Sequence, residues 1–284
     1  MNSIKKLFAD FSELVMFKHS VFSLPFIFIA MLVAADGWFG WRLFFLGILA
    51  AVSARNFAMG VNRYFDRDID ILNPRTKGRP SVDGRVSRKQ MLGFILINGL
   101  LFIVVAYFVN DLAFWLSLPI LMVLGAYTLF KRFSTLAHLI LGVSLGLAPI
   151  AGVVAVSGEI TLWSLYLALG VMFWVAGFDL LYSLQDMEFD KAHHLHSIPS
   201  KFGAERTMWI ARIFHFLAVL FWVAFVVKAG LGFWAQLAVV LSAVMLGYEH
   251  YIVNKDFTKI DKAFFTVNGY LGFMFIFLII VELM

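Results

Sequence analysis

The sequence predicts an all-α, polytopic membrane protein with nine transmembrane helices. Hydrophobic residues make up 62% of the 284 residues and charged residues only 14%, and the mean hydropathy is +0.87. In soluble domains roughly a quarter of the residues are charged. A chain this apolar cannot cover itself with polar surface, so most of its surface must face lipid. The sequence has no cysteine, which excludes disulfides and thiolate metal sites.

The first apolar segment predicts a helix over 14–35, preceded by several lysines that include Lys18. Basic residues before an apolar run are also typical of a signal peptide. This run has no convincing cleavage site, and after a short turn it continues into a second predicted helix over 40–64. We therefore expect a retained first helix, with Lys18 and His19 reaching toward the membrane surface at its start.

The later apolar runs each reach the length of about 20 residues that a membrane-spanning helix needs. They predict helices over 90–109, 112–130, 135–156, 161–185, 207–228, 231–253 and 263–283. Short turns rich in Gly, Asn or Asp, such as Asn110-Asp111 and Ser157-Gly158, separate alternate pairs of helices. The chain shows no linker and no low-complexity segment, so we expect a single membrane domain over 1–284.

Basic residues are concentrated on one side of the predicted bundle. Arg42 and Lys228 lie near the opposite helix ends, and Arg55 lies within the second helix. The other 20 of the 23 Lys and Arg lie on the side of the N-terminus and of the loops that follow even-numbered helices. Cytoplasmic loops carry such an excess of positive charge. The pattern therefore predicts a cytoplasmic N-terminus and a C-terminus on the outside.

Two rows of polar residues occur at the cytoplasmic ends of the second and sixth predicted helices. The first row is Asn62, Asp66 and Asp70, and the second is Asp179, Tyr182, Asp186 and Asp190. Residues three or four positions apart share one helix face, whereas Asp68 and Glu188 point away from these faces. Arg55 precedes Asn62 by seven residues, which places it on nearly the same line and about 10 Å deeper by the helical rise.

The loops that follow the two rows also resemble each other. Pro80-Ser81 follows the first row, and Pro199-Ser200 follows the second at almost the same offset. With the rows themselves, this predicts two related halves plus one extra helix. Internal repeats commonly place a binding site at the interface between the halves.

The acidic rows require a counter-charge. A charged side chain inside a membrane costs roughly 2.5–3.5 kcal/mol, and like charges one turn apart repel each other. A bound metal or substrate would supply the opposite charge, and Mg²⁺ is a hard cation that takes carboxylates and phosphate oxygens. We predict Asp66, Asp70, Asp186 and Asp190 as metal ligands, with Asn62 adding a neutral oxygen. The nearby cations that would receive phosphates are Arg75, Arg79, Lys131, Arg132 and Lys191.

A magnesium-diphosphate site at a membrane surface suits an isoprenyl diphosphate, whose tail needs lipid and whose head needs metal. Metal would neutralise the leaving diphosphate and so promote cleavage of the allylic C–O bond. The resulting carbocation needs a dry cavity with aromatic faces. Aromatic residues form 17% of the chain, although most of them must be core or lipid-facing.

Two other classes of protein also use acidic residues in membrane helices. Ion-coupled secondary transporters have them, but their sites lie near the midplane, whereas these rows lie at one face. Phospholipid-type transferases of the CDP-alcohol class carry an Asp-Gly-x2-Ala-Arg pattern, which is missing here.

The histidines favour simpler interpretations. His193, His194 and His196 could be drawn as a zinc cluster with Asp190, but histidines this close together in a loop diverge. We expect His138 and His250, near cytoplasmic helix ends, to be interfacial residues.

Four motifs occur in order along the chain. They are Asn62-x3-Asp66-x3-Asp70, Asn73-Pro74-Arg75-Thr76-x2-Arg79-Pro80, Asp179-x2-Tyr182-x3-Asp186-x3-Asp190 and His196-Ser197-Ile198-Pro199. This set resembles the UbiA-type intramembrane prenyltransferases. Two further runs are similar to the fourth and fifth helices of that family, namely Tyr127-x3-Lys131-Arg132 and Leu141-Gly142-x3-Gly146-x2-Pro149-x2-Gly152. The resemblance covers nearly the whole chain.

The resemblance implies nine helices around a central cavity and transfer of a polyprenyl group to an acceptor by electrophilic alkylation. It also implies that the paired aspartates hold a Mg²⁺-diphosphate, with Asn62 and Asp179 assisting. The candidate catalytic residues are thus Asn62, Asp66, Asp70, Asp179, Tyr182, Asp186 and Asp190, and the candidate substrate-binding residues are Lys18, Arg55, Arg75, Arg79, Tyr127, Lys131, Arg132 and Lys191. One departure concerns Arg79, because Ser81-Val82-Asp83-Gly84 follows Arg79-Pro80 where many members have Leu-Pro-Ser-Gly.

Within the family, the run Leu195–Pro199, together with Arg55 and the start Asn62-Arg63-Tyr64, looks most like the quinone-pathway members, which act on 4-hydroxybenzoate or a dihydroxynaphthoate. The haem-farnesylating and chlorophyll branches look less similar. Arg55, or Lys18, would anchor the carboxylate of an aromatic acceptor. The resemblance implies a bacterial inner-membrane enzyme of ubiquinone or menaquinone biosynthesis, with lipid and the two substrates but no nucleic acid as partners.

Overall fold

The computed structural model describes residues 2–15 and 24–284. Within these ranges the chain forms helices and connecting loops and no strand, which confirms the predicted all-α class. Lys18 and His19 lie outside the described residues, so nothing in the structure bears on their expected role.

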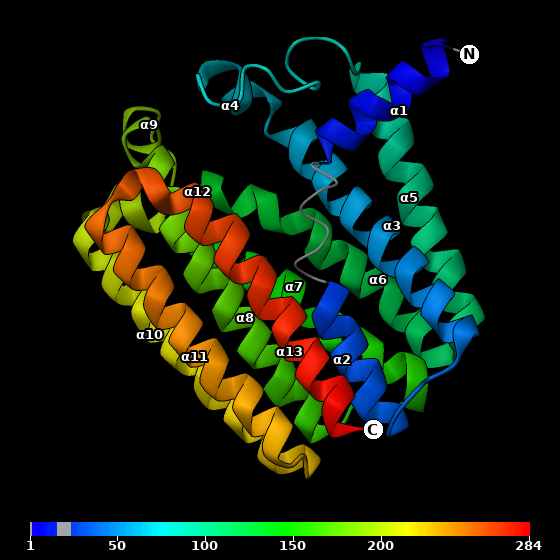
Figure 1. Ribbon diagram of the computed structural model, residues 1–284. Coiled ribbons are helices and arrows are strands. Elements are labelled where there is room, and N and C mark those ends of the chain that lie inside the picture. Colours follow the sequence, from blue (N-terminus) through cyan, green and yellow to red (C-terminus); the bar gives the residue numbers. More distant parts are fainter. Residues whose placement is uncertain (1, 16–23) are drawn as a thin grey trace.

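The helices are shown in Figure 1. In chain order they are α1 (Asn2–Leu14), α2 (Leu24–Ala35), α3 (Trp41–Phe65), α4 (Arg67–Leu72), α5 (Arg88–Val109), α6 (Asp111–Ala126), η2 (Tyr127–Arg132), α7 (Ala137–Ser157), α8 (Leu162–Ser183), η3 (Leu184–Asp186), α9 (Met187–Ala192), α10 (Ile198–Ala229), α11 (Phe233–Lys255), η4 (Phe257–Lys259), α12 (Ile260–Lys262), η5 (Ala263–Val267) and α13 (Asn268–Glu282).

Eight helical segments in the described part of the chain are long and apolar enough to cross a membrane. They are Trp41–Phe65, Arg88–Val109, Asp111–Arg132, Ala137–Ser157, Leu162–Ala192, Ile198–Ala229, Phe233–Lys255 and Phe257–Glu282. Helix α2 is apolar but has only 12 residues, so the predicted number of nine spans stays a prediction. Large side chains such as Trp115, Met122 and Val227 are mostly exposed, as expected where the solvent is lipid.

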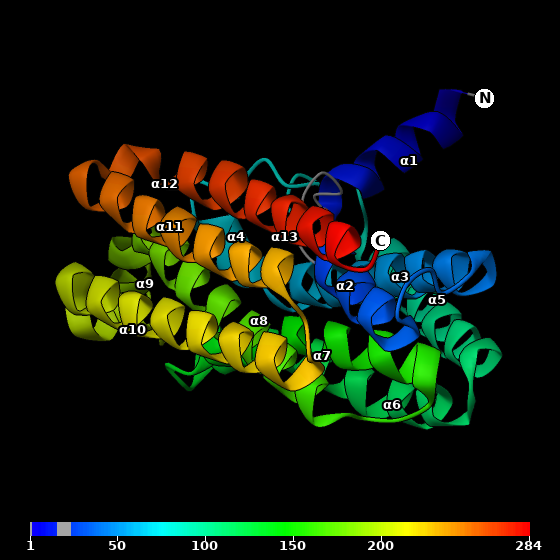
Figure 2. The ribbon, with the colours of Figure 1, turned by 60° about the horizontal axis from the view of Figure 1, so that its bottom comes forward.

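The helices pack side by side in one bundle (Figures 1 and 2). Helix α8 packs most extensively against α7 and α10, α3 packs against α5, and α2 lies against α7 and α13. The short helices α4 and α9 lie at one end of the bundle, on the side of α1, whereas the C-terminus lies at the other end (Figure 1).

Small residues allow α7 to approach its neighbours closely. A Cβ atom added to Gly142 would lie 2.3 Å from the carbonyl oxygen of Met172 on α8, and one added to Gly152 would lie 2.6 Å from that of Ile27 on α2. Helices in lipid associate through such close backbone packing. The glycine-rich run noted in the sequence therefore places one face of α7 directly against α8.

In both halves of the chain, a long helix is interrupted within the acidic row and a short helix follows. We expected each row to continue along one helix, but α3 breaks at Asp66, and α8 gives way to the turn η3, which ends at Asp186. Asp66 separates α3 from α4 with φ −85° and ψ 2°, and Asp186 precedes α9 with φ −98° and ψ 1°. Both short helices that follow have six residues. The same backbone conformation at equivalent aspartates supports the predicted relation between the halves.

A buried hydrogen-bonded link joins α8, α11 and α13. Trp174 Nε1 donates to Asn268 Oδ1 at 2.7 Å, and Asn268 Nδ2 donates to Glu249 Oε1 at 3.0 Å. All three residues are 1% exposed. His250, expected at the interface, instead lies within the bundle with its Nε2 atom 3.0 Å from Nδ1 of buried His215.

We predict that Asn268→Ala lowers the thermal stability of the protein in detergent. The substitution leaves the Trp174 N–H and the Glu249 carboxyl buried without partners, at a cost of about 1–3 kcal/mol for each group. The matched control is Asn254→Ala, because Asn254 is exposed on the last turn of α11 and its removal should change stability by less than about 0.5 kcal/mol. Equal melting temperatures for the two variants would contradict the role of the link.

Candidate active site

A cavity of about 490 Å³ lies between the two halves of the bundle, and its wall changes character along its depth. Near the ends of α3 and α8 it is lined by charged residues. Farther back along α3 and α7 it is lined by small and apolar residues, which include Ala51, Ala54, Ala58, Leu141, Leu145 and Ala148. The cavity therefore has one charged end and an apolar interior.

Most of the residues predicted from the sequence meet in this cavity. Its wall contains Arg55, Asn62, Asp66, Asp70, Arg75, Arg79, Tyr127, Lys131, Asp179, Tyr182, Asp186 and Asp190. Residues more than one hundred positions apart thus face one space, as the expected interface between halves requires.

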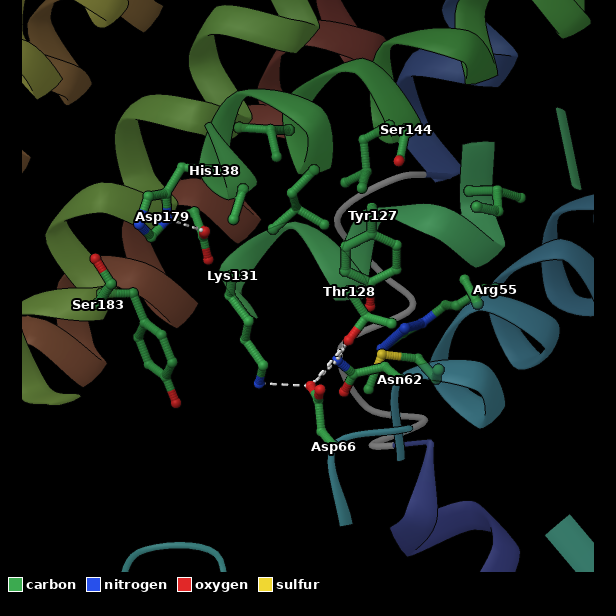
Figure 3. Close-up of a pocket in the computed structure, with 18 of the residues that line it drawn as sticks. Arg55, Asn62, Asp66, Tyr127, Thr128, Lys131, His138, Ser144, Asp179 and Ser183 are labelled. Carbon is green, nitrogen blue, oxygen red and sulfur yellow. Dashed lines mark hydrogen bonds and ion pairs between the residues drawn. The ribbon is translucent and has the colours of Figure 1, made fainter. Parts of the chain in front are cut away.

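Asp66 is held by three neighbours (Figure 3). Its Oδ2 atom accepts hydrogen bonds from Asn62 Nδ2 at 2.7 Å and from Thr128 Oγ1 at 2.9 Å, and it lies 2.6 Å from Lys131 Nζ. Asn62 and Lys131 were predicted from the sequence. Thr128 was missed, although it directly follows Tyr127 in the motif that resembles the family.

Asn62 is itself positioned by Arg63, a residue that was not predicted from the sequence. Arg63 Nη1 donates to Asn62 Oδ1 at 2.9 Å, and Arg63 Nε donates to the carbonyl oxygen of Leu14 at 3.3 Å. Arg63 is 5% exposed. The end of α1 is therefore connected through Arg63 to the first acidic row.

Asp186 is bound by residues from the other half of the chain. Asn73 Nδ2 and Arg75 Nε each donate to Asp186 Oδ1 at 3.0 Å, and Arg75 Nη2 pairs with Asp186 Oδ2. Arg75 Nη1 also donates to the Tyr182 hydroxyl at 3.2 Å. The loop after α4 is thereby fastened over the cavity to the second acidic row.

The source of the counter-charge differs from the expectation. We expected only a metal or a substrate to offset the acidic rows, but the chain supplies its own cations. Lys131 pairs with Asp66, Arg75 with Asp186, and Arg79 Nη1 lies 2.6 Å from Asp70 Oδ1. A buried charge without a partner is strongly unfavourable, which explains why each of these carboxylates holds a Lys or Arg.

The same carboxylates keep oxygen atoms available. Asp66 Oδ1 and Asp70 Oδ2 are buried and accept no hydrogen bond within the described residues. Such anionic oxygens are the ligands that Mg²⁺ prefers, so the donor set fits the predicted metal. In the described part of the chain, no three acidic or histidine side chains are gathered closely enough to hold a metal ion in this arrangement.

Two predicted phosphate-binding residues lie outside the cavity wall. Arg132 donates to exposed Asp68, with Nη2 and Oδ1 2.7 Å apart, and these hydrogen bonds lower the pKa of Asp68. Lys191 lies 3.0 Å from Glu188, whose side chain is 78% exposed. The sequence suggested that Asp68 and Glu188 face away, but not that each would pair with one of these cations. Arg132 Nη2 also lies 3.9 Å from Asp66 Oδ1, so it remains beside the first acidic row.

His138, expected near the membrane interface, is buried in the cavity wall. It lines the cavity, is 7% exposed, and its Nδ1 atom lies 2.7 Å from Asp179 Oδ2 (Figure 3). A signal for this was present in the sequence. His138 precedes Gly142 by four residues, and therefore shares the face of α7 that packs on α8.

Comparison with known proteins agrees with this architecture. The sequence model described as the UbiA prenyltransferase family matches residues 23–279. The chain belongs to this family. It is accordingly an integral membrane prenyltransferase, and the family predicted from the motifs is confirmed.

Several UbiA relatives cover most of the chain. The 4-hydroxybenzoate octaprenyltransferase of Dechloromonas aromatica (strain RCB) is 29% identical over 241 residues, which are 84% of this chain and 81% of that protein. The protein of the same name from Cupriavidus necator is 26% identical over 245 residues, with 86% and 85% covered.

Solved UbiA structures share the fold. The apo structure of a UbiA homolog from Aeropyrum pernix K1 has a TM-score of 0.85 and 31% identity, and covers 94% of this chain and 98% of that one. A UbiA homolog from Archaeoglobus fulgidus bound to DMAPP and Mg²⁺ has a TM-score of 0.76 at 18% identity, with 96% and 99% covered.

We predict that cysteines placed at Asn73 and Asp186 can be joined by a short thiol-reactive cross-linker, because these two side chains are in contact. The natural sequence has no cysteine, so the background reaction is absent. Mass spectrometry of the digested protein should find the linked peptides. Cysteines at Asp68 and Asp186 are the control, because Asp68 faces away from the cavity. Equal linking of both pairs would contradict the contact between the loop after α4 and Asp186.

Proposed function

We propose that this UbiA-family protein transfers a polyprenyl group from a polyprenyl diphosphate to an aromatic acid, with Mg²⁺, by electrophilic aromatic substitution. The acceptor class is a 4-hydroxybenzoate or a dihydroxynaphthoate of ubiquinone or menaquinone biosynthesis. The names of the relatives from Dechloromonas and Cupriavidus support the first of these.

The proposal depends above all on the polarity of the cavity. Four aspartates and four cations line its charged end, and small apolar side chains line its interior. This matches a substrate with an anionic head and a hydrocarbon tail. The UbiA homolog from Archaeoglobus fulgidus, which shares the fold, was solved with such a substrate, DMAPP, and with Mg²⁺.

The three paired cations are the proposed phosphate ligands. Lys131, Arg79 and Arg75 each bind one carboxylate, and each is about one quarter to one third exposed in its side chain. An incoming diphosphate offers these cations an alternative anionic partner. Their transfer to the phosphates would release the carboxylates Asp66, Asp70 and Asp186 for the metal.

When bound, Mg²⁺ would supply positive charge that offsets the charge of the departing diphosphate. Asp66, Asp70, Asp186 and Asp190, with Asn62, are the residues that would hold it. The chain itself contributes the orientation of the head group and the exclusion of water from the apolar interior.

Arg55 is the proposed anchor for the acceptor. It lines the cavity on α3 seven residues before Asn62, about 10 Å farther in by the helical rise. Figure 3 places it across the cavity from Asp179. A guanidinium group in this position suits a carboxylate on the aromatic ring.

The proposed function also bears on the domain organisation and on the orientation of the protein in the membrane. We infer one catalytic domain in the bacterial inner membrane, with the charged end of the cavity toward the cytoplasm and the C-terminus outside. The basic loops at that end of the bundle support this orientation. Membrane lipid would surround the exposed apolar helix faces.

We predict that purified protein releases diphosphate and forms a prenylated acid when it is given Mg²⁺, radiolabelled geranyl diphosphate and 4-hydroxybenzoate or a dihydroxynaphthoate. Chelation of the metal should stop the reaction. Asp186→Asn should lower turnover by at least about 100-fold, because a metal ligand and phosphate-orienting group is lost. The control Glu188→Gln, an exposed acid two residues away, should keep turnover within about twofold. If neither product forms with any acceptor, the proposed function is wrong.

We predict that Arg55→Ala raises the KM for 4-hydroxybenzoate by about 10- to 100-fold, which corresponds to the loss of a charge-assisted hydrogen bond. The KM for the prenyl diphosphate should not change. Phenol, which lacks the carboxylate, is the matched acceptor, and its use should be insensitive to the substitution. An equal loss with both acceptors would show that Arg55 does not bind the carboxylate.

A further inference from the structure

Besides the three ion pairs at its charged end, the cavity contains a pair of ionisable side chains farther in, Asp179 and His138. Asp179 Oδ2 and His138 Nδ1 are 2.7 Å apart, and both residues line the cavity. Asp179 precedes Asp186 by seven residues on α8, which corresponds to about 10 Å along the helix. It lies across the cavity from Arg55 (Figure 3), which is eleven residues before Asp66 and thus about 16 Å back along α3.

Asp179 differs in its partner from three other cavity aspartates, Asp66, Asp70 and Asp186. Asp66, Asp70 and Asp186 are each paired with a Lys or Arg, whereas the ion-pair partner of Asp179 within the described residues is His138. A carboxylate bound by a Lys or Arg is committed to that ion pair. Among these four side chains, Asp179 is the one whose carboxylate is not held by a Lys or Arg within the described residues.

The orientation of the pair exposes the carboxylate and hides the imidazole. The Asp179 side chain is 22% exposed, whereas that of His138 is 8% exposed behind it. His138 Nε2 is buried with no hydrogen-bond partner within the described residues. A proton on Nε2 would be an unsatisfied buried donor, so the favoured neutral tautomer carries its proton on Nδ1 and donates it to Asp179.

The proposed reaction needs a proton acceptor at this depth. The allylic C–O bond breaks and its electron pair leaves with the diphosphate. The acceptor ring then forms a C–C bond to the prenyl carbon, and the alkylated ring carbon must lose its proton so that the C–H electrons restore aromaticity. The diphosphate sits at the charged end, so the ring lies farther in, between Arg55 and Asp179.

We propose that Asp179 accepts the proton released from the alkylated ring carbon, and that His138 is a positioning residue that holds Asp179 toward the cavity. This rests on the proposed prenyl transfer to an aromatic acceptor that carries hydrogen at the reacting carbon. His138 keeps one carboxylate oxygen occupied and leaves the other to face the ring. The protonated Asp179 then returns its proton to water after product release.

The test compares 4-hydroxybenzoate with the same acid deuterated at both carbons next to the hydroxyl group. In the wild-type protein, ring deprotonation is fast and both acceptors react at the same rate. In Asp179→Asn, transfer should fall by about 100-fold or more, as expected when a general base is lost. The remaining transfer should be slower with the deuterated acid, and diphosphate release should exceed formation of the prenylated acid.

The positioning role is tested at His138. An Asn side chain places its amide nitrogen near the site of Nδ1, so His138→Asn keeps the donor to Asp179, whereas His138→Leu removes it. We expect His138→Asn to retain most of the turnover. His138→Leu should lower kcat by about tenfold or more with little change in either KM, and should also become slower with the deuterated acid. His194→Asn in the exposed loop is the control and should match the wild-type protein.

The outcomes separate the two proposals. Wild-type protein that forms no prenylated acid contradicts the proposed function. Active wild-type protein whose Asp179→Asn variant shows equal rates with both acids and matched loss of both products contradicts only the proton-acceptor role. If Asp179→Asn does not fold, gel filtration and melting in detergent will show this. The comparison of His138→Asn with His138→Leu then tests the proposal. Equal loss in His138→Asn and His138→Leu would then overturn the proposal.

Discussion

The structure depends on the pairing of buried carboxylates with cations at one end of the cavity. A carboxylate in a membrane bundle is costly unless it is paired, and three of the five aspartates in the paired motifs, Asp66, Asp70 and Asp186, hold a Lys or Arg. The partner of Asp186 comes from the other half of the chain, so the pairing also fastens the two halves together and brings the loop after α4 over the cavity. The electrostatic requirement that makes the site possible thus also shapes its entrance.

The broken helices explain how two long, apolar elements deliver these groups. Helix α3 runs through the bundle and stops at Asp66, whereas α8 ends at Ser183 and continues through the turn η3 to Asp186, which has the same backbone conformation as Asp66. A short helix then carries the next acid of the row, Asp70 or Asp190, past the end of the long one. The break lets consecutive acids face the cavity while the apolar parts of α3 and α8 remain packed in the bundle. Deeper in the cavity, Arg55 and Asp179 occupy opposite walls, where the environment is mostly apolar.

The two acidic rows, the depth of Arg55 and the family could all be predicted from the sequence, because helical spacing assigns residues to faces. The differences concern partners. Arg132 and Lys191, predicted to bind phosphates, pair with Asp68 and Glu188, and Arg132 Nη2 also lies 3.9 Å from Asp66 Oδ1. His138 was expected at the interface but binds Asp179. Spacing along one helix states which residues share a face, but it does not state which face of another helix they will meet.

The sequence by itself determined that this is a helical membrane protein with two matching acidic rows, since hydropathy and helical period are local properties of the chain. Only the tertiary structure decided how the charges are balanced and which residues surround them. Lys131 reaches Asp66, and Arg75 reaches Asp186, across separations of 65 and 111 residues. Such pairs form because burial of a charge demands the nearest available opposite charge. The nearest one in space depends on how all the helices pack, and no short stretch of sequence contains that information.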